Sequence, residues 1–280
     1  MNKMIESALL SNHATLGVHW IYDHEYIKKL SDTRSILFMK QDKSIFDKAK
    51  TSFFVYENNQ YSVQGEILKW LYEALEDNPL LSAKDFDDIL YKQFKPGGYY
   101  QGYVEKYGKL QVFNRLIDEL NLSMDKQVIN DQQMVAFVPY IVFKALGRDF
   151  SDAMDFVKIY SNDPIYEEFF KMFDLLFDYL KVFTLQEALE KAITECPNHF
   201  ELAFKKALEV KDTDEFIEKY AGRACPYKHA LPVIVHLLYH YSSYEDVTMA
   251  NALIGGASAD RGLLLGAILS EVYRIPEKWL

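Results

Sequence analysis

The hydrophobic pattern favours helices over almost the whole chain. Apolar residues recur at steps of three and four in residues 65–74, and residues 166–182 repeat that spacing. This is the period of an amphipathic α-helix, whereas strict alternation would indicate a half-buried strand. Further helices are predicted at 112–120, 134–146, 188–193, 231–240 and after Gly255-Gly256. Only residues 52–56 have a weak strand pattern, so the prediction is an all-α fold.

The chain shows no sign of division into separate domains. Turn residues punctuate it locally, as at 96–98, 147–149 and 162–164, without a low-complexity linker or an internal repeat. Its 280 residues, 49% hydrophobic and 26% charged, are enough to bury a large core. We therefore predict one domain spanning residues 1–280.

Charge and cysteine content exclude several classes of protein. A net charge of −10 argues against non-specific nucleic-acid binding, which needs a basic surface, but not against a small anion in a local pocket. Two cysteines, Cys196 and Cys225, imply no disulfide framework. The apolar stretch at 136–143 is too short to span a membrane, and the first residues lack a signal-peptide core. The expectation is a cytoplasmic protein without a membrane partner.

Several segments carry a family resemblance. Residues 11–23, SNHATLGVHWIYD, are similar to the ADALxLGxHWIYD opening of a bacterial branch of the ADP-ribosylglycohydrolase (crystallin J1-like) family. Residues 61–64, YSVQ, stand where metal-dependent members have Tyr-Thr-Asp-Asp. Residues 255–262, GGASADRG, stand where those members have Gly-Gly-Asp-Thr-Asp-Thr, and IPEKW at 275–279 matches their Ile-Pro-x-x-Trp. Residues 222–232 also resemble the bacterial branch, so the resemblance spans nearly the whole chain.

The resemblance implies an orthogonal helical bundle with a central cleft that holds two Mg²⁺ ions. Mg²⁺ prefers about six oxygen ligands, so a pair of ions needs several carboxylates close together. The ions then orient a ribose and an attacking water for cleavage of a glycosidic bond.

The carboxylates of that metal centre are missing from this chain. The second motif has Val63 and Gln64 where two aspartates belong, and the last has Ala257 and Ala259. Asn12 replaces the aspartate of the opening motif. Without these charges two divalent ions would lose hydration with little return, so we predict that the family magnesium pair is absent and that no metal is bound.

Part of this departure matches the bacterial branch, whose motifs tend toward Gly-Asp-Gln and Gly-Gly-Asp-Ser-Ala-x-Arg. Four residues agree with that version: Gln64, Ser258, Ala259 and Arg261. Asp260 adds one carboxylate beside the lost positions, and it is the candidate catalytic residue.

The last motif supplies one group of candidate ligand-binding residues. Gly255, Gly256 and Ser258 open a helix, where free backbone N–H groups and a serine cap attract anions. The alternative is an ordinary helix cap. Arg261 would bind phosphate or pair with Asp260, unless the two form only an exposed helical pair.

The remaining candidates lie in the earlier motifs. Asn12, Ser62 and Gln64 would hydrogen-bond a ribose, or Ser62 and Gln64 merely cap the helix that starts near residue 61. His19 would act as a base or contact the ligand, although a histidine satisfied inside the core is the alternative. Arg223 is a candidate anion contact.

Three further features have competing interpretations. His236 and His240 are four residues apart, as in a metal-binding pair, but no ligand spacing completes a site. Cys225 lies between Arg223 and Pro226 and is either a reactive thiol or a buried structural cysteine. The aromatic run at 99–103 forms either a lid over a ligand or a packed surface loop.

Three functions remain open. The first is a degenerate family member that binds ADP-ribose or a related nucleotide-ribose ligand, with hydrolase activity lost or divergent. The second is an active, metal-independent glycosidic-bond hydrolase that uses Asp260, Asp23 or Asp131 as general base. The third is a structural or interaction protein that retains only the fold, a role that a cleft filled by its own side chains would favour. Whether the chain is an enzyme therefore stays undecided at this level.

Overall fold

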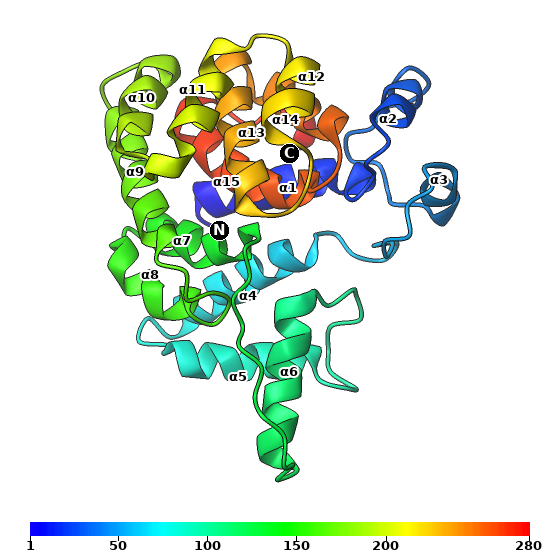
Figure 1. The fold of residues 1–280 in the computed structure, drawn as a ribbon, viewed down its shortest axis with the longest axis vertical. Coiled ribbons are helices and arrows are strands. Elements are labelled where there is room, and N and C mark those ends of the chain that lie inside the picture. Colours follow the sequence, from blue (N-terminus) through cyan, green and yellow to red (C-terminus); the bar gives the residue numbers. More distant parts are fainter.

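The computed structural model describes residues 1–280 and contains fifteen α-helices and no β-sheet (Figure 1). The prediction of an all-α fold is confirmed. The helices are α1 (Lys3–Thr15), α2 (His24–Ser31), α3 (Lys43–Lys48), α4 (Val63–Asp77), α5 (Ala83–Phe94), α6 (Lys106–Glu119), α7 (Phe137–Ala145), α8 (Phe150–Val157), α9 (Ile165–Tyr179), α10 (Leu185–Ala192), α11 (Glu201–Glu209), α12 (Thr213–Phe216), α13 (Tyr227–His240), α14 (Tyr244–Ile254) and α15 (Ser258–Val272). None of them combines the length and apolar character needed to cross a membrane.

The weak strand pattern at residues 52–56 does not correspond to a strand. This segment runs between α3 and α4 without a sheet partner. Its aromatic side chains pack on other aromatic rings: Phe53 and Tyr56 each lie with their ring centroid 5.4 Å from that of Trp20. The aromatic residues that resembled a strand therefore serve tertiary packing.

Helices α1 and α15 come from opposite parts of the sequence and lie side by side at the centre of the molecule (Figure 1). Gly266 allows this approach, because a Cβ atom there would overlap the backbone of Ser7 and Ala8. The Ser7 hydroxyl donates a hydrogen bond to the Gly266 carbonyl over 2.6 Å. The two helices run antiparallel, so the end of α1 meets the beginning of α15.

The core is continuous around this central pair. One cluster of 63 buried apolar residues runs from Met4 in α1 to Leu269 in α15 and includes side chains from most of the intervening helices. A smaller cluster of 11 lies mainly beneath α2 and α3. Helices α5 and α6 extend away from the central pair (Figure 1). The assignment of residues 1–280 to a single domain stays a prediction.

Candidate functional site

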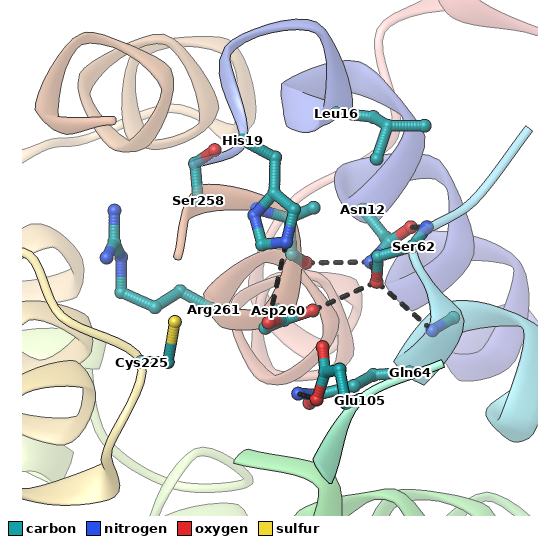
Figure 2. Close-up of polar contacts among 12 residues, drawn as sticks. Asn12, Leu16, His19, Ser62, Gln64, Glu105, Cys225, Ser258, Asp260 and Arg261 are labelled. Atoms are coloured by element: carbon teal, nitrogen blue, oxygen red, sulfur yellow. Dashed lines mark hydrogen bonds and ion pairs between the residues drawn. The ribbon is translucent and has the colours of Figure 1, made fainter. Parts of the chain in front are cut away.

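Five of the predicted site residues meet where α1 ends and α4 and α15 begin (Figure 2). The Asn12 amide donates to the Ser62 hydroxyl at 2.9 Å, and its oxygen accepts from the Ser62 backbone N–H at 3.0 Å. The Ser62 hydroxyl in turn donates to Oδ1 of Asp260 at 2.9 Å. With Glu105, described below, these residues form the central polar cluster: Asn12, His19, Ser62, Gln64, Glu105 and Asp260.

Ser62 has the capping role that the sequence offered as the alternative to ribose binding. As the residue before α4, its hydroxyl accepts from the Gly65 backbone N–H at 3.3 Å and caps the helix. The same oxygen accepts a hydrogen bond from the Asn12 amide and donates one to Asp260. The capping residue therefore also holds the Asp260 carboxyl group in place. Gln64, the second residue of α4, is fully buried and points toward Glu105 (Figure 2).

His19 is neutral and in one tautomer. Its Nδ1 accepts a hydrogen bond from the Ala259 backbone N–H at 3.3 Å, which leaves the proton on Nε2. Burial lowers the pKa of His19 to about 3, and the positive charge of Arg261 acts in the same direction. Nε2 lies 3.6 Å from Oδ2 of Asp260. Although this is ion-pair distance, a neutral imidazole makes it a polar contact.

Glu105, the residue before α6, is the functional candidate that the sequence did not reveal. It is buried, and Gln64 donates to its Oε2 over 3.2 Å (Figure 2). The aromatic run at 99–103 precedes it directly, but no sequence pattern places residue 105 beside residue 260. Only the packing of the loop before α6 against α4 brings it into the cluster.

The two carboxyl groups of the cluster hold protons unusually tightly. Burial raises the pKa of Glu105 well above its usual range, and the charge of Asp260 raises it further. Burial also raises the pKa of Asp260 to about 7, against the lowering effects of Ser62 and Arg261. Two neighbouring acids in a dry site do not both ionise, so the pair retains a proton at neutral pH.

The turn before α15 differs from the sequence-based expectation in two ways. Ser258 is not the helix cap: α15 begins at Ser258 itself, and its hydroxyl donates to the Thr15 carbonyl at 3.0 Å. Asp260 and Arg261 do not pair, because adjacent residues on a helix point in different directions (Figure 2). Arg261 is completely buried and donates to Oδ1 of Asn251 at 2.9 Å and to the Gly255 carbonyl at 2.6 Å.

The two glycines of this turn are required by its shape. Gly255 and Gly256 have φ of 68° and 57°, the left-handed region in which a side chain is strained. A Cβ atom on Gly256 would overlap the Arg223 carbonyl oxygen. The Ala257 N–H donates to that same oxygen at 3.2 Å, which ties residues 222–232 to the start of α15.

Several other candidates lie outside the central polar cluster. His236 and His240 both contact the Ala207 carbonyl oxygen, at 3.1 and 3.0 Å, so their pairing on α13 is structural. Asp23 caps α2 by accepting from the Tyr26 N–H at 2.9 Å. Across the molecule, no group of three or more His, Cys, Asp or Glu side chains is placed to hold a metal ion.

Cys225 and Asp131 lie near the cluster without joining its hydrogen-bond chain. Burial raises the pKa of Cys225 to about 12, which argues against a reactive thiol and for the structural alternative. Asp131 accepts from the Gln133 N–H at 2.8 Å, and its charge contributes to the raised pKa of Asp260 and Glu105.

Aromatic side chains seal the cluster from solvent. We call Trp20, Phe53, Phe54, Tyr56 and Tyr103 the aromatic cover. Trp20 stacks on His19 with ring centroids 4.6 Å apart, and Phe54 stacks on Tyr103 at 5.9 Å. Trp20 has φ of 70°, a backbone conformation rare for a bulky residue. Phe53 and Phe54 are 47% and 45% exposed, whereas Trp20 and Tyr56 are buried.

The cover is flanked by surface pockets that do not reach the cluster. One of about 400 Å³ is lined by Phe54, Trp70 and Tyr100, and another of about 430 Å³ is lined by Leu16, Gln41 and Tyr56. Of the aromatic run expected as a lid, Tyr103 belongs to the cover, whereas Tyr99 is 79% exposed. The cleft implied by the family resemblance is thus filled by the chain's own side chains.

Hydrogen-bonding capacity is left unused at this site. Eleven buried side-chain polar atoms in the molecule have no hydrogen-bond partner, and eight of them belong to the cluster, its immediate surroundings or the neighbouring arginines. The eight are His19 Nε2, Tyr56 Oη, Gln64 Oε1, Glu105 Oε1, Tyr107 Oη, Arg223 Nη2, Asp260 Oδ2 and Arg261 Nη1. Buried polar atoms are normally paired, so the concentration of unpaired ones at this place is unusual.

Comparison with known proteins finds a distant relative of this chain. No family model matches the chain. It is 21% identical to "Crystallin J1A" of Tripedalia cystophora over 294 aligned residues, which cover 99% of this chain and 89% of that protein. The chain is therefore a distant homologue of a crystallin J1 protein along its whole length.

Proposed function

We propose that the chain is a divergent protein of the ADP-ribosylglycohydrolase type that binds ADP-ribose or a related nucleotide-ribose ligand without a magnesium pair. The distant relation to crystallin J1A supports the type, and the family resemblance is the reason for proposing that the ligand binds at the central polar cluster. The observation that carries the proposal is the concentration of unpartnered buried polar atoms there. A ribose hydroxyl both donates and accepts, so it suits Asp260 Oδ2, Gln64 Oε1 and the Nε2–H of His19.

The residues present do not fit two Mg²⁺ ions. Val63, Ala257 and Ala259 offer no side-chain oxygen, and the two carboxyl groups that remain retain a proton at neutral pH. The buried guanidinium of Arg261 adds positive charge near Asp260. Binding therefore rests on hydrogen bonds, and the aromatic cover has to move for a ligand to enter.

Calorimetric titration with ADP-ribose, with and without Mg²⁺, tests the proposal. We expect saturable binding that Mg²⁺ does not change, and a loss of about tenfold in affinity for Gln64→Ala, since one hydrogen bond in a dry site is removed. Gln186→Ala is the matched control, because Gln186 contacts only the Tyr239 carbonyl on α13, far from the cluster. No binding of ADP-ribose, NAD or ADP at about 1 mM would contradict the proposal, as would binding that requires Mg²⁺.

A second candidate function is metal-independent hydrolysis, and the coupled carboxyl pair favours it. A protonated carboxyl donates to a leaving oxygen or nitrogen while an ionised one takes a proton from water. Asp260, whose pKa is about 7, is suited to the second role at neutral pH. If wild type releases ADP-ribose from modified protein, Asp260→Asn should slow it by about a hundredfold or more, measured by chromatography of the product. Complete inertness of the wild type toward ADP-ribosylated protein and small glycosides would exclude this function.

A third candidate is a structural or interaction protein, and the closed aromatic cover favours it. Trp20 and Tyr56 occupy the region above His19. If this candidate is correct, calorimetric titration with any nucleotide-ribose ligand shows no binding. The buried polar atoms without hydrogen-bond partners count against it, because such atoms destabilise the folded protein. A protein that serves only as a scaffold gains nothing in return for that loss.

A further inference from the structure

Beside the central polar cluster, two arginines reach the same turn, Arg223 from the loop before α13 and Arg261 from α15. Arg223 donates through Nε to the Ile254 carbonyl at 3.2 Å, and Arg261 donates through Nη2 to the Gly255 carbonyl at 2.6 Å. Because these carbonyls belong to consecutive residues, both guanidinium groups lie against the same turn. The φ of 68° at Gly255 gives the turn its shape.

Each arginine has one buried nitrogen without a partner. In Arg261 this is Nη1, since Nε binds Asn251 and Nη2 binds Gly255. In Arg223 it is Nη2, since Nη1 pairs with Glu218 at the surface. Arg261 is completely buried, whereas the Arg223 side chain is 12% exposed, so this pair connects the interior with the surface.

Tyr22 and Cys225 flank the arginines and share one hydrogen bond with each other, which leaves one donor hydrogen for a ligand. The hydroxyl of Tyr22 lies 3.6 Å from the sulfur of Cys225, and Figure 2 shows Cys225 beside the Arg261 side chain. Burial lowers the pKa of Arg261 to about 10, with opposing effects from Cys225 and Tyr22 and a further lowering effect from Arg223. All four side chains therefore share one environment, and Arg261 remains charged at neutral pH.

We propose that Arg223 and Arg261, with Tyr22 and Cys225, form a binding site for a phosphate-class oxyanion. Two guanidinium groups near each other repel, and a bound anion relieves that repulsion. Glu218 offsets the charge of Arg223, and Asp260 offsets that of Arg261 only in part because its pKa is about 7, so a surplus positive charge remains for a ligand. Donors that approach from several directions suit the tetrahedral oxygens of phosphate better than the two coplanar oxygens of a carboxylate.

This site deepens the proposed function, on which it rests for the identity of its natural ligand. A phosphoryl group of a nucleotide-ribose ligand would occupy it while the ribose contacts the central polar cluster. Free phosphate has the same chemistry, and the two sources are separated by titrating inorganic phosphate, pyrophosphate and ADP-ribose in parallel.

The test is titration calorimetry at constant ionic strength with wild type, Arg223→Gln and Arg148→Gln. Arg148 is a matched control because it also contacts one carboxylate, that of Asp152, and one carbonyl, that of Pro79, at the far side of the molecule. We expect saturable binding of phosphate or pyrophosphate to wild type and Arg148→Gln, weakened about tenfold or more in Arg223→Gln.

The outcomes separate this site from the proposed function. If phosphate binding depends on Arg223 but ADP-ribose binds no more tightly than phosphate, the oxyanion site is supported. A nucleotide-ribose ligand for that site is then excluded. Binding of ADP-ribose that Arg223→Gln leaves unchanged overturns the oxyanion site while the proposed function stands. If Arg223→Gln does not fold, the wild type decides: acetate binding as tightly as phosphate, or no saturable phosphate binding, overturns the site.

Discussion

Replacing Asp260 with asparagine is expected to stabilise the fold by a margin that grows as the pH rises from about 4 to about 7, with an upper bound of about 4 kcal/mol. The folded state binds the Asp260 proton more tightly than the unfolded state, because burial raises the pKa from 3.8 to about 7. The stabilisation due to this proton is therefore present at low pH and is lost as the pH rises through the folded pKa. An amide cannot ionise, so the variant avoids this loss.

One feature of the site limits the size of that gain. The Ser62 hydroxyl can donate to the new amide oxygen as it does to Asp260 Oδ1, but the Nε2–H of His19 then faces an NH₂ group. Burial also lowers the pKa of His19 and of His236, to about 3 and about 4, which makes the wild type less stable as the pH falls below 6.5. The difference between variant and wild type isolates Asp260 from these opposing effects.

Urea denaturation of both proteins between pH 4 and pH 8, values that bracket the titration range, measures the difference. Asp155→Asn is the control, since Asp155 is exposed and pairs only with Lys158 at the surface. Its difference from wild type should not vary with pH in this way. If Asp260→Asn is instead most destabilising at pH 8, the carboxyl group is ionised in the folded protein and the fold depends on its charge.

Gly266→Ala is expected to destabilise the protein by about 2 kcal/mol, because the new methyl group has no room between α1 and α15. It would overlap the Ser7 carbonyl oxygen and the Ala8 Cα, both of them backbone atoms that move only if the helices separate. This cost exceeds the gain of about 1 kcal/mol that alanine normally brings inside a helix.

Gly108→Ala on α6 is the matched control. Its Cβ would meet the Val104 and Phe94 side chains, at 2.7 and 3.1 Å, which can shift more easily than backbone. Thermal and urea unfolding should therefore show a clear loss for Gly266→Ala and a much smaller change for Gly108→Ala. Equal effects at the two positions would mean that α1 and α15 are not packed through their backbones at this point.

The sequence predicted the helical class and the main helices, because the period of apolar residues reports directly on which face of each helix is buried. The helices predicted at 65–74 and 231–240 lie inside α4 and α13. It failed at residues 52–56, where aromatic side chains serve contacts with Trp20 that no local pattern encodes.

Motif resemblance located Asn12, Ser62 and Asp260, which the structure joins in one hydrogen-bond chain. Glu105 was not predicted, because its position depends on how the loop before α6 packs against α4. That contact cannot be inferred from a single sequence. The expected pairing of Asp260 with Arg261 failed for a simpler reason. Successive helical residues are rotated by about 100°, so neighbours in sequence face different environments.

The pairing of α1 with α15 also constrains how the chain is made. A ribosome that has synthesised every helix up to α14 has released an α1 whose principal partner does not yet exist. The apolar face and the Asn12 side chain of α1 then lack their partners until α15 has been synthesised. Contacts between residues so far apart in sequence also form slowly. We therefore expect the nascent chain to remain open, and dependent on protection from aggregation, until translation has passed residue 272.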